Sequence, residues 1–266
     1  MRPAATVMLV RDGAGPAPLE VLMVRRSLES EFVGGAYVFP GGALDPADGS
    51  GAEAFCAGRT DEETSAVLEI ESGGLAYWVA ALRECFEEAG ILLAYRADGS
   101  LLSFGDPDEE QRFSEYRRAL NAGELSFFEL CRRESLTLAC DRVLYFAHWI
   151  TPLGAVRRYD TRFFLAPSPP EQIPLHDAAE VIASQWVRPP DALASWEAKE
   201  IDLVLPTLRT LRAIGQFPTS AALLEDVARR STVTTNTPRY VNDVYGTRIV
   251  LPGDQGDEIV DMARRG

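Results

Sequence analysis

The sequence predicts a folded protein of the mixed α/β (α+β) class. Segments with the two-residue alternation of strands and segments with the 3.6-residue period of helices follow one another along most of the chain. The composition suits a packed core, because 46% of the 266 residues are hydrophobic and 25% are charged. At this length the chain can bury one large core, or one domain with appendages.

The predicted elements follow in chain order. A turn around Gly13–Pro16 joins two strands into a hairpin, and a third strand and a long helix follow; their ranges are 4–10, 19–25, 36–39 and 75–89. The acids near 61–63 and 106–110 are read as helix starts, which the helix dipole favours. The later elements are helices 106–123 and 125–133, paired strands 143–149 and 158–166, strand 180–187, helix 192–214 broken around Pro206, helix 217–230 and strand 248–251.

The helix at 75–89 carries the most informative pattern. An apolar stripe covers one side, and Gly90 stands where a helix C-cap belongs. Glu84, Glu87 and Glu88 stand at i, i+3 and i+4, so they share a face directed away from that stripe. Such a cluster of like charges is destabilising, and Arg83, four residues before Glu87, offsets only part of the repulsion.

Clustered carboxylates have two interpretations. They can form a solvated acidic face, or they can hold a hard cation such as Mg²⁺ or Mn²⁺ over a phosphate. The strand 36–39 ends in Pro40-Gly41-Gly42, whose bare backbone can approach a ligand closely. A carbonyl there, at Gly42, could complete the metal shell, which favours the second interpretation.

These residues resemble the Nudix hydrolases. The family's box ends in Arg-Glu-U-x-Glu-Glu-x-Gly-U, with U apolar, and residues 83–91 match every fixed position. The front half departs from the pattern, because the sixth position after Gly42 is Asp48 in place of glutamate and 34 residues, where the family has seven, separate it from Arg83. Residues 49–74 are read as the resulting insertion. The resemblance implies an α/β/α sandwich with a mixed sheet, here with an inserted helical cap formed by helices 106–123 and 125–133.

The upstream stretch resembles the coenzyme A diphosphatase branch of that family. Residues 22–27, Gly35 and 39–42 match its signature in spacing, with Val24 in place of a threonine and Glu31 in place of an arginine. The insertion, the run 42–48 and the run 157–164 resemble the acyl-CoA diphosphatase subgroup. The resemblance covers residues 4 to 215, so we expect a Nudix domain at 1–215, with insertions near 49–74 and 105–139, and a C-terminal extension at 216–266 packed on it.

The resemblance implies hydrolysis of the pyrophosphate of coenzyme A or acyl-CoA, giving 3′,5′-ADP and (acyl-)4′-phosphopantetheine. Glu84 and Glu88, supported by Glu87 and a carbonyl of the Gly41/Gly42 turn, would hold one to three ions. With only two histidines, His148 and His176, a carboxylate must act as base, and Glu84, Glu87 and Glu180 are the candidates. Asp160 is read as a local ion-pair partner of Arg158 or Arg162, and Arg83 would orient Glu87.

Two arginine pairs are candidates for phosphate contacts, Arg25/Arg26 and Arg157/Arg158, although arginines at strand ends are often only solvated. The net charge of −14 argues against nucleic-acid binding, and no apolar run is long enough to cross a membrane. Without a secretory pattern at the N-terminus, we expect the cytoplasm. Cys56, Cys85, Cys131 and Cys140 lack the spacing of a zinc site.

Alternatives stay open at this point. An ADP-ribose or NADH pyrophosphatase uses the same box, and a non-catalytic Nudix-like protein could bind a nucleotide and regulate a partner. The family also implies that a homodimer can form. The acyl-chain preference, the number of ions and the role of the chain after Gly215 do not follow from the sequence.

Overall fold

The computed structural model describes residues 1–16, 18–27, 34–174, 181–243 and 246–252, and the side chains of 242–248 are left aside. The predictions for Glu180, His176 and Glu31 fall outside these ranges. The helices are α1 (Asp61–Leu68), α2 (Leu75–Ala89), α3 (Pro107–Asn121), α4 (Phe127–Arg133), α5 (Pro189–Glu197), α6 (Leu205–Ile214) and α7 (Ser220–Ala228), with short 3-10 turns η1 (Pro46–Gly49), η2 (Ala52–Ala54) and η3 (Cys140–Arg142).

Within the described ranges, eight strands form one mixed sheet. Its main path runs β10-β7-β8-β1-β2-β3, with β4 paired to β1 and β9 paired to β2. The β1/β8 and β10/β7 pairs are parallel and the others antiparallel. The strands are β1 (Arg2–Asp12), β2 (Leu19–Arg26), β3 (Tyr37–Val38), β4 (Gly41–Ala43), β7 (Leu144–Ile150), β8 (Tyr159–Pro167), β9 (Val181–Val187) and β10 (Thr235–Asn236); two further pairs are β5 (Ala94–Tyr95) with β6 (Thr137–Leu138) and β11 (Arg239–Asp243) with β12 (Gly246–Val250).

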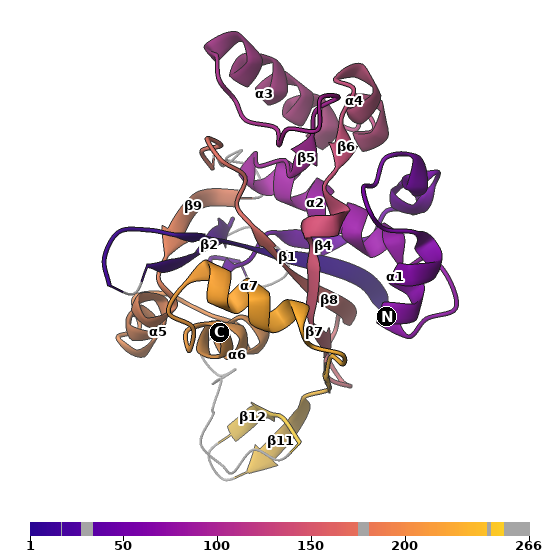
Figure 1. Ribbon diagram of the computed structural model, residues 1–266. Helices are drawn as coiled ribbons and strands as arrows, with labels where there is room; N and C mark the ends of the chain where they lie inside the picture. Colours follow the sequence, from indigo (N-terminus) through magenta and orange to yellow (C-terminus); the bar gives the residue numbers. More distant parts are fainter. Residues whose placement is uncertain (17, 28–33, 175–180, 244–245, 253–266) are drawn as a thin grey trace.

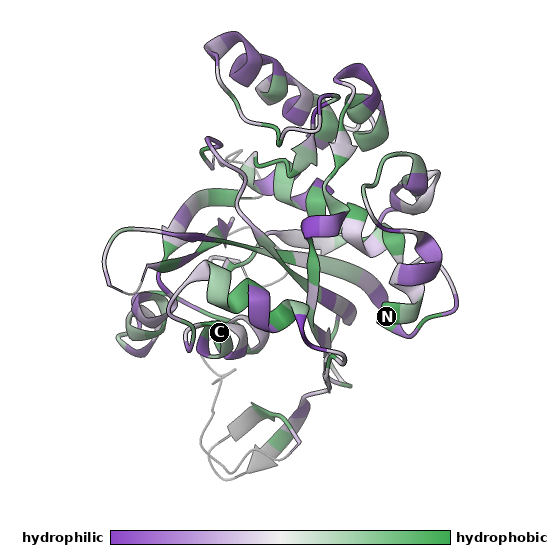
Figure 2. Cartoon of the chain, viewed as in Figure 1, coloured by the Kyte–Doolittle hydropathy of each residue, from purple (hydrophilic) through white to green (hydrophobic). Residues whose placement is uncertain are grey.

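Helices cover both faces of the sheet (Figure 1). Successive side chains of β1 point to opposite faces, so Val7 and Leu9 join the core beneath α2, while Met8 and Val10 join the core beneath α5, α6 and α7. Figure 2 shows hydrophobic residues along the central strands and a mostly hydrophilic α3 at the periphery. The predicted α/β/α sandwich with a mixed sheet is therefore confirmed.

Helix α2 has the predicted bounds and cap. The whole apolar stripe is buried, and Gly90 takes a left-handed conformation, with φ of 71°, while its amide donates to the Phe86 carbonyl. Part of its acidic face is covered by another element. Glu88 is buried, at 3% exposure, because β4 packs against that turn of the helix.

The insertion at 49–74 is not a plain loop. It folds into η2 and α1, whose start is fixed by a capping box between Thr60 and Glu63. The Asp61 carboxylate also accepts hydrogen bonds from the amides of Gly73 and Leu75, at 2.9 and 3.0 Å. The insertion therefore caps the N-terminus of α2, which has no side-chain cap of its own.

The helical pair α3 and α4 braces the other end of α2. Arg117 of α3 donates from Nε to the carbonyl of Glu87 at 2.8 Å and from Nη2 to the carbonyl of Glu88 at 2.7 Å. In Figure 1 the pair lies beyond α2, on the side away from the sheet. The inserted helices are present as predicted, but α3 supports the C-terminal turn of α2, and no described residue of the pair lines the large cavity beside β4 and α2.

The predicted helix 192–214, expected to be broken around Pro206, is two helices, α5 and α6. The break lies at 198–204, and Pro206 occupies the first turn of α6, where proline is tolerated. Beyond residue 215, α7 buries Leu223 and Val227 against the sheet and β10 extends the sheet beside β7, so the described part of this segment packs on the domain. Among the described residues, no helix has the length and apolar character to cross a membrane.

Candidate active site

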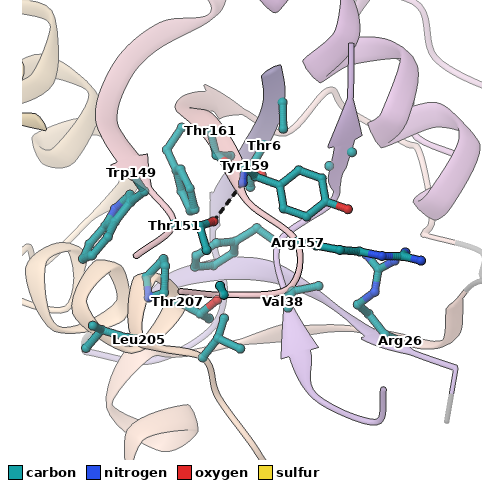
Figure 3. Close-up of a pocket in the computed structure, with 18 of the residues that line it drawn as sticks. Thr6, Arg26, Val38, Trp149, Thr151, Arg157, Tyr159, Thr161, Leu205 and Thr207 are labelled. Atoms are coloured by element: carbon teal, nitrogen blue, oxygen red, sulfur yellow. Dashed lines mark hydrogen bonds between the residues drawn. The ribbon is translucent and has the colours of Figure 1, made fainter. Parts of the chain in front are cut away.

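A large cavity of about 1840 Å³ opens where four parts of the fold meet. Its floor is formed by the ends of β1, β7 and β8, and one side is formed by β4 and the last turns of α2. The opposite walls come from the connection between α5 and α6 and from the β11–β12 hairpin. Figure 3 shows side chains of β1, β7, β8 and α6 around one space.

Arg83 organises the acidic side of this cavity. Its guanidinium donates to both oxygens of Asp48, at 2.8 and 3.0 Å, and from Nη1 to Glu84 at 2.8 Å and Glu87 at 2.7 Å. Its Nη2 also donates to the Ala43 carbonyl of β4 at 3.0 Å. The predicted pairing of Arg83 with Glu87 is present. One guanidinium thus holds three carboxylates and fixes β4 against α2.

Glu84 is left with an excess of negative charge around it. Burial raises its pKa to about 7, and the neighbouring carboxylates of Glu87 and Asp48 add to the rise, while Arg83 opposes it. Three carboxylates around one guanidinium carry a net charge of about −2 when all are ionised. A divalent cation is the counterion that would let Glu84 ionise at this place.

Glu88 is joined to the glycine turn. Its Oε2 accepts a hydrogen bond from the Gly41 amide at 2.9 Å, and its Oε1 lies 3.8 Å from Nη1 of Arg26. Gly42 lies so near Glu84 that a Cβ on it would stand 2.5 Å from Glu84 Oε2. The sequence predicted this turn beside the carboxylates, and the structure brings Gly41 and Glu88, 47 positions apart in the chain, into contact.

These donors suit a hard divalent cation. Glu84, Glu88 and Gly42 line the same cavity, and carboxylate and carbonyl oxygens are the ligands that Mg²⁺ and Mn²⁺ take. Glu87 does not line it and is held by Arg83 instead. Over the described residues, no three or more His, Cys, Asp or Glu side chains are already gathered around one point. Binding of an ion would therefore draw the carboxylates together from their present partners.

The structure separates the two members of each predicted arginine pair. Arg26 and Arg157 line the cavity, and Figure 3 draws both on the side away from Trp149. Arg25 donates to the Gly35 carbonyl at 3.2 Å and lies over the Tyr37 ring, and Arg158 donates to the Thr151 carbonyl at 3.1 Å. Neither Arg25 nor Arg158 is among the lining residues. One arginine of each pair thus lines the cavity.

Asp160 and His148 form a separate structural pair. His148 Nε2 lies 2.6 Å from Asp160 Oδ1 and its Nδ1 lies 2.8 Å from Thr235 Oγ1, which ties β10 to β7. The hydrogen bond from His148 holds the pKa of Asp160 below its ordinary value. Arg162 lies 3.8 Å from the same carboxylate, as one of the two predicted partners.

The sequence did not reveal two groups of cavity residues. Asp48 does not itself line the cavity but holds Arg83, which does; it stood out only as a departure from a motif, and its pairing with Arg83 crosses the insertion. Apart from Tyr159, which lies in the run 157–164, the aromatic and apolar walls come from segments without a motif; they include Trp149, Trp196, Leu205, Tyr240 and Ile249. Alternation along β7 and β8 could have placed Trp149 and Tyr159, but nothing in the sequence connects the C-terminal hairpin to this site.

Comparisons with known proteins agree with this geometry. The family model described as the NUDT19 Nudix domain matches residues 53–214. The chain is 30% identical to the acyl-coenzyme A diphosphatase NUDT19 of Gallus gallus, over 81% of this chain and 68% of that protein. It is also 30% identical to the acyl-coenzyme A diphosphatase NUDT19 of Homo sapiens, over 76% of this chain and 63% of that protein. It therefore spans about two thirds of the length of these curated relatives. A solved structure, a NUDIX hydrolase from Alicyclobacillus acidocaldarius, is similar with a TM-score of 0.66 and 30% identity, over 85% of this chain and 96% of that one.

Proposed function

This chain is a Nudix hydrolase of the NUDT19 family, and we propose that it cleaves the pyrophosphate of coenzyme A or its thioesters with a divalent cation. The products would be 3′,5′-ADP and 4′-phosphopantetheine or its acyl derivative. Nudix hydrolases in general use a divalent metal, and we propose Mg²⁺ or Mn²⁺ here. The relatives named acyl-coenzyme A diphosphatase support the substrate class.

One observation carries the proposal. The carboxylates of Glu84 and Glu88, the Gly42 backbone and the guanidinium groups of Arg26 and Arg157 line a single cavity. Oxygen donors for a cation therefore lie beside cations that can bind the remaining phosphate oxygens. A pyrophosphate ester is the ligand that uses both kinds of group at once.

Each residue then has a defined task. Glu84, Glu88 and the Gly42 carbonyl would hold the ion, which when bound neutralises charge on the pyrophosphate and activates water. Arg26 and Arg157 would bind and orient the phosphates. Arg83 keeps Glu84 and Glu87 in place through hydrogen bonds from its Nη1. Glu84 can use one oxygen as a ligand and the other to accept the proton of the attacking water.

The test is turnover by the purified protein with Mg²⁺ or Mn²⁺. CoA, acetyl-CoA, octanoyl-CoA, ADP-ribose and NADH would be compared by their kcat/KM values, with the products identified by mass. We expect 3′,5′-ADP from the CoA species and far slower hydrolysis of the others. Release of AMP from ADP-ribose or NADH at a higher kcat/KM than that for the CoA species would identify the protein as an ADP-ribose or NADH pyrophosphatase. Metal-dependent binding of CoA without any hydrolysis would favour a regulatory protein.

We further propose that Glu180, which lies outside the described residues, can accept the proton of the attacking water. We also propose that the protein forms a homodimer and acts in the cytoplasm. A pH profile of kcat for Glu180→Gln beside Glu84→Gln would separate the two acids, because loss of the proton acceptor removes one limb of the profile.

A further inference from the structure

The cavity continues beyond the carboxylates into an apolar end. Trp149, Trp196, Leu203, Leu205, Tyr240 and Ile249 line it there. Figure 3 shows Trp149 and Leu205 on one side of the space and Arg26 and Arg157 on the other. The two ends of the cavity therefore suit different parts of one ligand.

The C-terminal hairpin supplies part of this end. Tyr240 of β11 and Ile249 of β12 are directly opposite each other in the antiparallel register, so their side chains share one face of the hairpin. Both residues line the cavity, together with Pro238. The β7–β8 turn touches the hairpin, since a Cβ at Gly154 would lie 3.8 Å from the Tyr240 ring. The hairpin lies outside residues 53–214, which the family model matches.

Charge and exposure divide this end into a mouth and an interior. The connection between α5 and α6 also places Glu197, Lys199 and Asp202 at the cavity, and all three are exposed. Leu203 and Leu205, a few residues later, are buried at 4% exposure each. Polar groups thus border the opening, and the apolar side chains lie deeper. Val156, on the β7–β8 turn, also lines the cavity and is fully exposed to solvent.

We propose that this apolar end, formed by the Tyr240/Ile249 face of the hairpin with Trp196, Leu203 and Leu205, binds the acyl chain of a CoA thioester. The inference rests on the proposed function, which places the pyrophosphate at Glu84 and Glu88. The acyl chain is the one extended apolar part of such a substrate, and its burial against these side chains is favourable. A cavity of about 1840 Å³ exceeds the roughly 300–1,000 Å³ of ordinary ligand pockets, which leaves room for a chain in addition to the nucleotide.

The test is binding without turnover. Dissociation constants of CoA, butanoyl-CoA and octanoyl-CoA would be measured by calorimetry in EDTA. We expect the wild type to bind octanoyl-CoA about tenfold more tightly than CoA or better, with butanoyl-CoA between them, because each buried methylene adds affinity. Equal affinities for all three would overturn the inference, whether or not the protein hydrolyses them.

Three variants locate the effect. Ile249→Asp puts a carboxylate on the apolar face, and we expect it to reduce the ratio of octanoyl-CoA to CoA affinity about tenfold. Val241→Asp is the matched control, since Val241 neighbours Tyr240 on the same strand and is absent from the cavity lining, and its ratio should match the wild type. Ile249→Ala repeats the test with a smaller disturbance of folding. If Ile249→Asp and Ile249→Ala weaken CoA and octanoyl-CoA equally, the hairpin binds the nucleotide instead, and the inference fails.

Turnover separates this inference from the proposed function. If the wild type hydrolyses CoA species at rates and affinities that are independent of chain length, the proposed function stands and the acyl site is wrong. If it binds octanoyl-CoA more tightly than CoA but hydrolyses neither, the acyl site stands and the proposed hydrolysis is wrong.

Discussion

Arg83 donates to both carboxylate oxygens of Asp48, at 2.8 and 3.0 Å, across an insertion that contains a helix of its own. Both side chains are largely buried, at 12% and 2% exposure. This bidentate pair joins the turn after β4 to α2 and so fixes the distance between the glycine turn and the carboxylates. The insertion is accommodated because its two ends remain tied together at this pair and at Asp61.

We expect Arg83→Ala to destabilise the protein by about 3–5 kcal/mol, because it leaves the carboxylates of Asp48, Glu84 and Glu87 close together without their shared cation. Urea unfolding at pH 7.5 in EDTA measures the free energy of unfolding. Arg229→Ala, which breaks an exposed pair with Glu225, is the control and should cost less than about 1 kcal/mol. An equal loss of unfolding free energy in the two variants would show that the Arg83 cluster stabilises the protein no more than an exposed ion pair does.

Gly42→Ala should reduce activity far more than stability. The added Cβ would stand 2.5 Å from the Glu84 carboxylate, so Glu84 must move away from the cavity. We expect kcat/KM for CoA to fall about 100-fold or more, with thermal unfolding close to the wild type. Gly49→Ala places a Cβ at an ordinary 3.6 Å from Ala76 and serves as the matched glycine control. Wild-type activity in Gly42→Ala would show that the close approach of Gly42 to Glu84 is not needed for the reaction.

The metal-free protein should lose stability as the pH rises from about 4.5 to about 7. The pKa of Glu84 is about 7 in the folded protein and near 4.5 in the unfolded chain, so the folded state keeps a proton that the unfolded state has already released. The shift corresponds to about 3 kcal/mol. Glu84→Gln should remove that part of the slope and be the more stable protein at pH 8 in EDTA. Saturating Mg²⁺ or Mn²⁺ should flatten the wild-type curve, because the ion replaces the proton. An unchanged slope in Glu84→Gln would contradict the raised pKa.

Arg117→Ala should weaken the C-terminal turn of α2. Arg117 is buried and donates to the carbonyls of Glu87 and Glu88, so its removal leaves two helix-end acceptors without these donors. We expect a loss of about 2–4 kcal/mol in the free energy of unfolding. Arg118→Ala, at the next position and 69% exposed in its ion pair, is the control and should change little. A similar small change in both would mean that α3 does not brace α2.

Local periodicity predicted most of the elements, because strands and helices leave their signal in neighbouring residues. The bounds of α2 and its Gly90 cap were predicted correctly for that reason. Adjacent arginines were harder to judge. Successive side chains of a strand point in opposite directions, so only Arg26 of the pair Arg25/Arg26 reaches the cavity. The same rule could have restricted that prediction to one member of the pair.

Long-range packing could not be predicted in the same way. The burial of Glu88 depends on β4, which is 45 or more residues away in the sequence, and the Asp48–Arg83 pair is concealed by the insertion. The β11–β12 hairpin lines the cavity only because α7 and β10 return the chain to the edge of the sheet beside β7. Such contacts follow from the path of the whole chain, and no local pattern encodes them.

The most direct test of the central claim compares wild type with Glu88→Gln, incubated with octanoyl-CoA and Mg²⁺ and followed by mass spectrometry. Glutamine can still accept the hydrogen bond from Gly41, so we expect an intact fold, checked by unfolding in urea. Our account predicts 3′,5′-ADP and octanoyl-4′-phosphopantetheine from the wild type, and a rate lower by about 1,000-fold or more in the variant, because a ligand charge is lost at the proposed ion site. Release of the same products by Glu88→Gln at the wild-type rate would contradict it.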